Sequence, residues 1–405
     1  MLPAITMKPF ALRTLPALVL AAFSGLASAA SFQQWGQNAS GLGVAYAGSA
    51  AVADNASTNY FNPAGLTQLD GFQLSVGAVG LGSRYEFRDN GSTPAGGGNG
   101  GDAGAWSALP NLYISARLTE DLSAGFGISA PFKVATEYNN GWLGQVQALK
   151  TDISAVNYNP SLAYRLNDKV SLGLGVNYQR LNAELTSFDT VANGFNRFEG
   201  DDSAWGWNAG ALFKLSPAMK VGIAYRSGLS YRLDGTRTVA GVAAPATANL
   251  KLPGTATLSV WQQVSDRWEA MGDLSYTRWR QANGMTVASA VGSDLENFNY
   301  KNAWRLAWGA AYKANDALKL KFGLAYERTP VQSPASQTAR IPDADRLWLT
   351  LGGQWNAGRY GKFDLGYAYI HLKDAGISQV KGASTLNGEY DAAGHQLGVQ
   401  YSVGF

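Results

Sequence analysis

Residues 318–326 read Leu318-Lys319-Leu320-Lys321-Phe322-Gly323-Leu324-Ala325-Tyr326, with a large apolar or aromatic side chain at every second position. Successive side chains of an extended strand point to opposite faces, so this period of two gathers the large apolar groups on one face. The same pattern occurs at 304–312 and 170–178. The other face is small, polar or charged. Such a face fits the crowded interior of a closed barrel, whereas the apolar face fits lipid.

The alternation continues outward from these stretches and is broken by turn signals at regular intervals. We expect fourteen segments, with the boundaries 71–88, 109–118, 122–138, 152–166, 169–187, 203–215, 219–233, 251–264, 267–285, 299–313, 317–328, 343–357, 362–373 and 392–405. Six connections are tight, such as Asn315-Asp316, and they alternate with longer loops such as 89–107, 188–202 and 374–391. Short turns on one side and long loops on the other are typical of the periplasmic and extracellular ends of an outer-membrane barrel.

The composition agrees with a barrel in the outer membrane. Charged residues make up 15% of the chain and there are 48 glycines, whereas a soluble protein carries about a quarter charged residues. No continuous apolar stretch of the length of a transmembrane helix follows residue 30. Aromatic residues near segment ends are candidates for interfacial girdles, namely Trp205, Trp207, Trp268, Tyr276, Trp355, Tyr367 and Tyr369. A soluble β-protein with an aromatic core is the alternative.

The first 29 residues have the features of a cleaved secretory signal. Lys8 and Arg13 precede the short apolar run 15–23, and Ala27-Ser28-Ala29 is a small-residue cleavage site. We expect cleavage after Ala29, with an uncleaved anchor as the alternative. The chain has no cysteine, which excludes disulfides and thiolate chemistry. Its net charge of +3 and the lack of a dense basic block do not favour a nucleic-acid partner.

Residues 30–70 differ from the rest, because they are rich in small residues and show no strand alternation. Eight strands already enclose an interior that wall side chains can fill, so fourteen leave room for a plug. We therefore expect an all-β fold, a 14-stranded antiparallel transmembrane β-barrel over 71–405, plugged by an N-terminal hatch over 30–70. Gly41-Leu42-Gly43 is not a dinucleotide fingerprint, since neither the third glycine nor a strand–helix context is present.

Several stretches resemble one family. Ala30-Ser31-Phe32-Gln33, the run Ser40-Gly41-Leu42-Gly43 with Ala45-Tyr46 and Gly48, and Asn62-Pro63-Ala64 are similar to the hatch of the FadL-type transporters of long-chain fatty acids. Further similar stretches span nearly the whole mature chain, at 135–138, 159–165 and 323–331. The terminal Phe405, which closes an alternating strand, resembles the end of outer-membrane barrels. The resemblance implies fourteen strands, a hatch and passive uptake of a hydrophobic ligand into the outer membrane.

The resemblance also implies an apolar ligand pocket beside the hatch and sideways release where the third strand kinks. Phe32 matches the aromatic residue that reaches into that pocket. The third strand here contains Ala130-Pro131-Phe132, and proline cannot donate a ladder hydrogen bond. We therefore expect a lateral gate at these three residues, unless Pro131 lies above the membrane near the rim. Pro160 in the neighbouring strand is its competitor.

Basic residues predicted to face inward could contact a ligand carboxylate or pair with acids across the lumen. They are Lys133, Arg165, Lys214, Arg226, Arg305, Lys313 and Arg346. Arg165 and Arg305 are favoured, because they lie in the stretches that resemble the family. The alignment of the family's carboxylate-binding residues to this chain stays open.

No enzyme is expected. The two histidines, His371 and His395, are predicted rim residues, and no serine lies in a nucleophile frame. No metal or cofactor site is apparent. The expected partners are a hydrophobic ligand, outer-membrane lipid and the barrel-insertion machinery, with the chain acting as a monomer. Uptake of aromatic hydrocarbons and a general diffusion porin remain alternatives.

Overall fold

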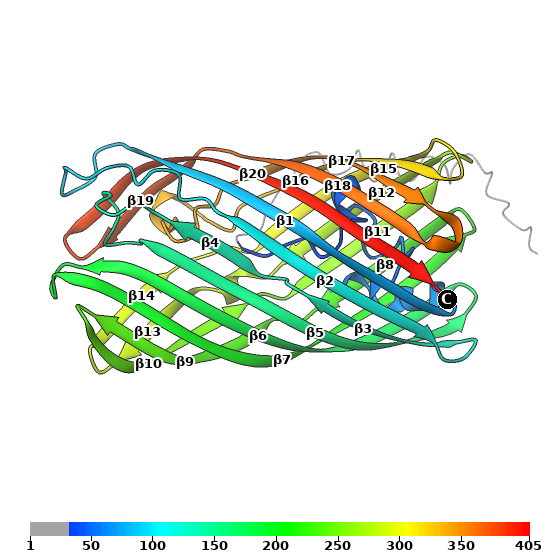
Figure 1. Ribbon diagram of the computed structural model, residues 1–405, viewed down its shortest axis with the longest axis horizontal. Coiled ribbons are helices and arrows are strands. Elements are labelled where there is room, and N and C mark those ends of the chain that lie inside the picture. Colours follow the sequence, from blue (N-terminus) through cyan, green and yellow to red (C-terminus); the bar gives the residue numbers. More distant parts are fainter. Residues whose placement is uncertain (1–31) are drawn as a thin grey trace, which may run out of the picture.

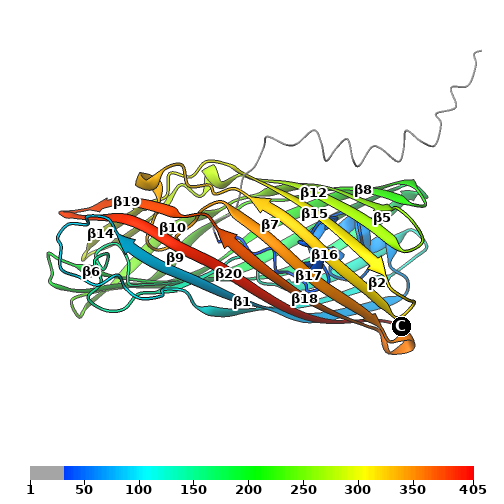
Figure 2. The same cartoon turned by 90° about the horizontal axis from the view of Figure 1, so that it is seen from above.

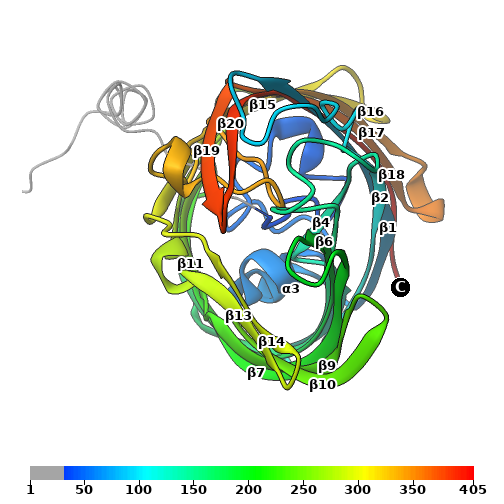
Figure 3. The ribbon, with the colours of Figure 1, turned by 90° about the vertical axis from the view of Figure 1, so that its left-hand side faces the viewer.

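The computed structural model describes residues 32–405, so the predicted signal at 1–29 and its cleavage site lie outside the described residues. Oblique antiparallel strands form a long barrel, seen from the side in Figures 1 and 2 and end-on in Figure 3. In chain order the wall strands are β1 (Phe72–Asp89), β2 (Trp106–Arg117), β3 with β4 (Leu122–Ser129, Lys133–Glu137), β5 (Lys150–Asn167), β6 (Val170–Asp189), β7 (Gly194–Ser216), β8 with β9 (Met219–Arg226, Leu229–Val239), β10 with β11 (Val242–Leu252, Thr255–Gln263), β12 with β13 (Trp268–Thr277, Gly284–Ser289), β14 with β15 (Gly292–Asn297, Ala303–Lys313), β16 (Leu318–Glu327), β17 (Arg346–Asn356), β18 with β19 (Lys362–Leu372, Ala375–Lys381) and β20 (Ser384–Gly404).

The first and last wall strands close the barrel. β1 pairs with β20 from Gln73↔Gly404 to Asp89↔Gly388, and it pairs with β2 on its other side. Closure leaves no lipid-exposed edge with unpaired backbone groups between these strands. The predicted all-β, 14-stranded antiparallel barrel is confirmed.

The period of two sorts side chains as the sequence predicted. In β16, Leu320 and Leu324 are 36% and 40% exposed on the outer face, whereas Lys321 between them is 6% exposed. Lys321 Nζ lies 2.8 Å from Asp364 of β18 inside the barrel. A buried cation needs such a partner, because an isolated charge away from water is strongly unfavourable.

Two predicted loops are wrong. Most of 188–202 belongs to β6 and β7, whose ladder runs up to Asp189↔Gly194, and most of 374–391 belongs to β19 and β20. The physical reason is that these hairpins extend beyond the wall's apolar band, so their outer face is polar and the apolar alternation disappears. For the same reason β20 starts at Ser384, earlier than the predicted residue 392. His395, predicted to lie at the rim, therefore lies in the middle of β20, where its Nδ1 is 2.8 Å from the Tyr367 hydroxyl.

The two ends of the barrel differ. The six predicted tight connections lie at the end that holds the C-terminus, which we call the turn end (Figure 1). At the opposite loop end, three longer connections lie at 90–105, 138–149 and 328–345. In outer-membrane barrels the short turns lie on the periplasmic side and the longer loops on the extracellular side, so the turn end is periplasmic and the loop end is extracellular. No helix between residues 32 and 405 is long and apolar enough to cross a membrane.

Residues 32–70, which we call the N-terminal segment, lie inside the barrel (blue in Figure 3). Their short helices are η1 (Leu42–Val44), α3 (Thr58–Phe61) and η2 (Pro63–Gln68). Asn62 caps η2 by accepting from the Ala64 N–H at 3.0 Å. Its amide nitrogen donates to the carbonyls of Ala50 at 2.7 Å and of Ala211 in β7 at 3.0 Å. The Asn62-Pro63-Ala64 motif therefore joins the segment to the wall.

Glycines in the wall make room for this motif. Gly173 of β6 and Gly210 of β7 are ladder partners. A Cβ at Gly210 would lie 2.0 Å from Asn62 Oδ1, and one at Gly173 would lie 2.3 Å from the Ala64 nitrogen. No side chain fits at such distances, so these positions allow close backbone approach.

Candidate functional site

The third wall strand is interrupted at Ala130-Pro131-Phe132. β3 ends at Ser129 and β4 begins at Lys133. β3 pairs with β2 and β5, whereas β4 pairs with β5 alone. Pro131 has no N–H to offer to a ladder, which explains why the strand breaks here. Pro160 lies within the continuous β5 opposite Phe126 of β3 and does not interrupt its strand.

The neighbouring strand β2 has no strand partner on the side of the break along the same stretch. Its ladder with β3 stops at Leu112↔Ile128, and residues 106–111 pair with β1 only. Pro110 lies in this stretch and removes one further donor. Towards the loop end, the Glu137 N–H donates to the Ala103 carbonyl at 3.0 Å and bounds the gap. We call this gap between β2 and β4 the wall break.

The N-terminal segment lines the wall break from inside. Gln33 and Phe132 form an antiparallel bridge. The Gln34 N–H donates to the Pro131 carbonyl at 2.8 Å, and the Lys133 N–H donates to the Phe32 carbonyl at 3.2 Å. Residues 32–34 thus occupy the place that β2 would take in a continuous wall. The buried backbone groups stay paired although the wall itself is open.

Phe32 lies just inside the break and is 1% exposed. Its ring centroid is 5.8 Å from that of Phe132 and 5.3 Å from that of Trp279. It belongs to an apolar cluster of inward side chains that includes Val134, Ile153, Leu181, Leu185, Leu233, Leu250, Met285, Val287, Phe298 and Ile341. An apolar interior beside a break in the wall suits a hydrophobic ligand.

A cation lies next to this apolar interior. Arg226 of β8 shares a small cavity with Gln33 and Phe132. Its Nη2 donates to the Tyr60 carbonyl at 2.8 Å, and its guanidinium lies 4.2 Å from the centre of the Tyr60 ring. Among residues 32–405, no carboxylate forms an ion pair with Arg226. The sequence predicted that Arg226 faces inward but favoured Arg165 and Arg305 over it as contacts of a ligand carboxylate.

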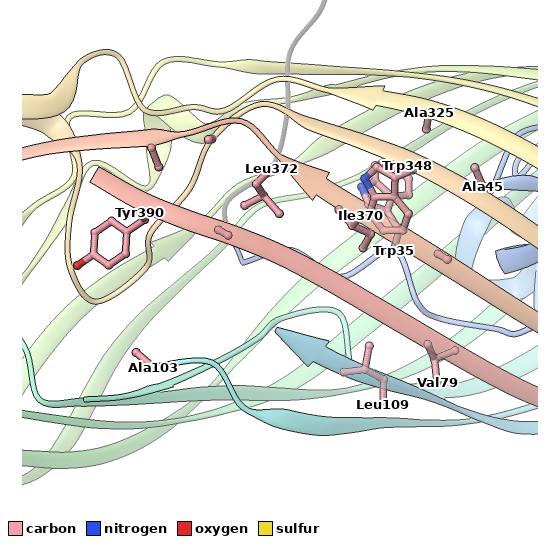
Figure 4. Close-up of a cluster of buried hydrophobic side chains, with 14 of the residues drawn as sticks. Trp35, Ala45, Val79, Ala103, Leu109, Ala325, Trp348, Ile370, Leu372 and Tyr390 are labelled. Atoms are coloured by element: carbon pink, nitrogen blue, oxygen red, sulfur yellow. The ribbon is translucent and has the colours of Figure 1, made fainter. Parts of the chain in front are cut away.

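Arg305, a predicted ligand contact, binds the N-terminal segment. Its Nη2 donates to the Ala45 carbonyl at 2.8 Å, and its guanidinium lies 4.6 Å from the ring of Trp35 and 5.2 Å from that of Trp348. Both indole N–H groups donate to Glu327, at 3.0 and 2.8 Å. Figure 4 shows the two indoles side by side within a cluster of buried apolar residues.

Arg165 lies elsewhere. Its guanidinium donates to the carbonyl of Thr67, and it lies two residues before the tight turn at Asn167. Arg165 and Arg305 therefore contact two different parts of the N-terminal segment, and Phe32 lies in a third part of it, so the three residues are not gathered in one site. Only Phe32 is at the wall break.

The loop 328–345 folds into the lumen at the loop end (Figure 3). Arg340, which is 3% exposed, donates through Nε to Glu296 of β14 at 2.8 Å and through Nη1 to the Thr186 carbonyl of β6 at 3.0 Å. The Arg340 carbonyl accepts from Thr136 of β4 at 3.0 Å. The loop thus spans the lumen and reaches the strand that follows the wall break.

Sequence reasoning missed most polar residues at the break. Gln34 donates its side-chain amide to the Lys133 carbonyl at 2.8 Å, and Gln37 contacts Ala130. Three glutamines at 33, 34 and 37, in a segment otherwise rich in small apolar residues, were the available signal. Amides that can both donate and accept are suited to satisfy an interrupted ladder.

A closed barrel that holds the N-terminal segment inside it, with lipid-facing apolar strands, an apolar interior and a broken wall, defines an outer-membrane transporter for hydrophobic compounds. Residues 20–405 match the family described as outer membrane protein transport protein (OMPP1/FadL/TodX). The chain belongs to this family, whose members are transporters and channels and not enzymes. It is an outer-membrane protein.

Two curated relatives cover most of the chain. Outer membrane protein P1 of Haemophilus influenzae is 31% identical over 93% of each chain. The long-chain fatty acid transport protein of Escherichia coli K12 is 28% identical over 90% of this chain and 92% of its own.

Two solved structures share the fold. A Pseudomonas aeruginosa FadL homologue has a TM-score of 0.87 at 23% identity, covering 93% of this chain and 100% of its own. The toluene transporter TodX of Pseudomonas putida has a TM-score of 0.71 at 17% identity, covering 91% and 99%.

Proposed function

We propose that this chain passively takes up long-chain fatty acids and releases them sideways into the outer membrane through the wall break. The observation that carries the proposal is the interruption at residues 130–132, where the N-terminal segment replaces β2 as the backbone partner. Ligand in the apolar interior beside Phe32 and Phe132 lies directly behind this gap.

Release into lipid is physically preferable to release into water. Moving a buried chain into water is unfavourable by about 0.8 kcal/mol per methylene. A closed ladder offers no passage between strands, so lateral escape requires an interruption. The N-terminal segment, residues 32–70, blocks the straight path along the axis, and a shift of residues 32–34 opens the lateral one.

A fatty acid is favoured over an aromatic hydrocarbon by the cation at Arg226. A carboxylate headgroup needs a charged or strongly donating partner once it leaves water, whereas toluene does not. Arg226 has no acidic partner among the described residues and lies beside Phe132. A relative named for long-chain fatty acid transport also matches over 90% of the chain at 28% identity.

Liposomes that contain the purified protein test the proposal. Labelled oleate should exchange into the liposome membrane faster than in protein-free controls, toluene should show a smaller effect, and sugars should cause no swelling. Rapid sugar entry would instead indicate a diffusion porin. Equal acceleration of toluene and oleate would remove the argument for a carboxylate ligand.

A further inference from the structure

Four exposed cations lie on the outer surface of the barrel towards the loop end. Lys251 lies in β10, Arg278 follows β12, Arg280 lies in η3 (Trp279–Gln281), and Arg328 follows β16. The neighbours of these residues along the chain are buried and point inward: Leu250 and Leu252 flank Lys251, Thr277 precedes Arg278, and Glu327 precedes Arg328. The cations therefore face outward. We call these four residues the basic patch.

Backbone contacts place the four residues on adjoining wall segments. The Arg278 N–H donates to the Gly254 carbonyl at 2.9 Å, beside the end of β10. The Arg280 N–H donates to the Asn302 side chain at 3.1 Å, and the Arg328 N–H donates to the Trp304 carbonyl at 3.4 Å. The patch is therefore a continuous stretch of the outer face between β10 and β16.

Three other exposed arginines near the loop end have acidic partners. Arg84 and Arg88 lie 2.6 and 2.9 Å from Asp391, and Arg197 lies 2.6 Å from Glu199. Within residues 32–405, none of the four patch residues forms an ion pair. The nearby carboxylate of Asp345 accepts from Tyr326 and Thr329 and pairs with Lys373 at 3.7 Å. The patch is thus a concentration of positive charge without internal neutralisation.

The patch lies directly beyond an aromatic pair. Tyr276 and Trp304 are in contact on the outer face, with ring centroids 4.4 Å apart, and Tyr276 precedes Arg278 by two residues. Tyrosine and tryptophan mark the level where hydrocarbon meets headgroups. Side chains one step further out meet the headgroups themselves. At the loop end these belong to the outer leaflet.

We propose that the basic patch binds the phosphate groups of the glycolipid that forms the outer leaflet of the Gram-negative outer membrane. Guanidinium groups recognise phosphate through paired hydrogen bonds, and three of the four residues are arginines. Basic side chains at a membrane surface each contribute to binding anionic headgroups. The site is separate from the wall break, since it faces lipid between β10 and β16 and the break lies between β2 and β4.

Binding of diphosphorylated lipid A to the purified full-length protein in neutral detergent micelles tests this proposal by native mass spectrometry. The variant R278Q/R280Q/R328Q should bind about one hundredfold more weakly, since each cation contributes about fivefold. The control R84Q/R88Q/R197Q removes three cations that have acidic partners and should bind within about twofold of the parent.

Two comparisons keep the result interpretable. Lipid A stripped of phosphate should bind parent and patch variant equally, and inorganic phosphate alone should not compete at millimolar concentration. If the triple variant does not fold, the single variants R278Q and R328Q should each show the fivefold loss. Parent-like affinity in the patch variants, an equal loss in the control, or full competition by inorganic phosphate would overturn the proposal.

Discussion

The side-chain amide of Gln37 spans the backbone of Ala130: its oxygen accepts from the Ala130 N–H at 3.1 Å, and its nitrogen donates to the Ala130 carbonyl at 3.0 Å. A glutamine of the N-terminal segment thus makes the two hydrogen bonds that a neighbouring strand would make. The wall break is held shut by side-chain and backbone groups of a segment that is not itself a strand of the wall.

Replacing Gln37 with alanine should loosen the break. Two buried backbone groups would lose their partners, and each unsatisfied group destabilises the closed state by about 1–3 kcal/mol. Amide hydrogen exchange at Ala130, Phe132 and Lys133 should accelerate. The control Gln68→Ala removes an amide whose bond to Thr67 is remote from the break. Unchanged exchange in Gln37→Ala would show that the glutamine does not hold the break.

Gly210→Ala should displace the N-terminal segment without unfolding the barrel. The added Cβ would overlap Asn62 Oδ1 at 2.0 Å, and such overpacking typically destabilises by about 1–3 kcal/mol. We expect a heat-modifiable barrel with raised ion conductance in planar bilayers. Gly272→Ala, where the nearest atom is 3.8 Å away, is the matched control. Normal conductance in a folded Gly210→Ala protein would argue against a hatch seated there.

The loop 328–345 should be released when its buried ion pair is broken. Arg340 and Glu296 are each 3% exposed, and Glu296 keeps a second cation, Lys381, at 3.1 Å, so the loss is that of charged hydrogen bonds, about 1.5–3 kcal/mol each. Arg340→Gln should therefore make the loop sensitive to protease in intact cells. Lys373→Gln, which removes a more exposed ion pair, should leave it resistant. Protection of the loop in both variants would contradict its dependence on Arg340.

The orientation of the barrel is testable by cysteine labelling, because the chain has no cysteine of its own. Ala192 lies in the turn between β6 and β7, and Asn315 lies in the turn between β15 and β16. A membrane-impermeant maleimide should label Ala192→Cys in intact cells, and it should label Asn315→Cys only after the cells are lysed. The opposite pattern would reverse the assignment of the two ends.

The wall strands were predictable because lipid forces one face of each to be apolar. Leu320 and Leu324 face out and Lys321 faces in, as the period of two requires. The predicted strand boundaries were wrong where the wall extends beyond the lipid. In the hairpin around Asn193-Gly194 the outer face meets polar surroundings while Phe198 still points inward, so β7 continues with Arg197 and Glu199 on its outer face and without an apolar pattern there.

The site was predictable only in part. Pro131 located the wall break through a local rule, namely the missing N–H. The partners of the break could not be found in this way, since Gln34 and Gln37 act across about one hundred residues of sequence. Arg305 shows what the alternating pattern cannot predict. The pattern predicts that the Arg305 side chain faces inward, but it does not tell whether Trp35 or a ligand contacts the guanidinium there.

The most direct test of lateral release is fatty acid uptake by cells that express Pro131→Val. Valine restores a backbone N–H and favours a strand, so β2 and the third wall strand should pair across the gap. Each ladder bond contributes about 1 kcal/mol, which shifts the balance towards the closed wall by about fivefold. Pro160→Val, in a strand that is already continuous, is the matched control. We predict uptake several-fold lower in Pro131→Val at normal barrel yield, with Pro160→Val unaffected; unchanged uptake in a well-folded Pro131→Val protein would contradict release through the wall.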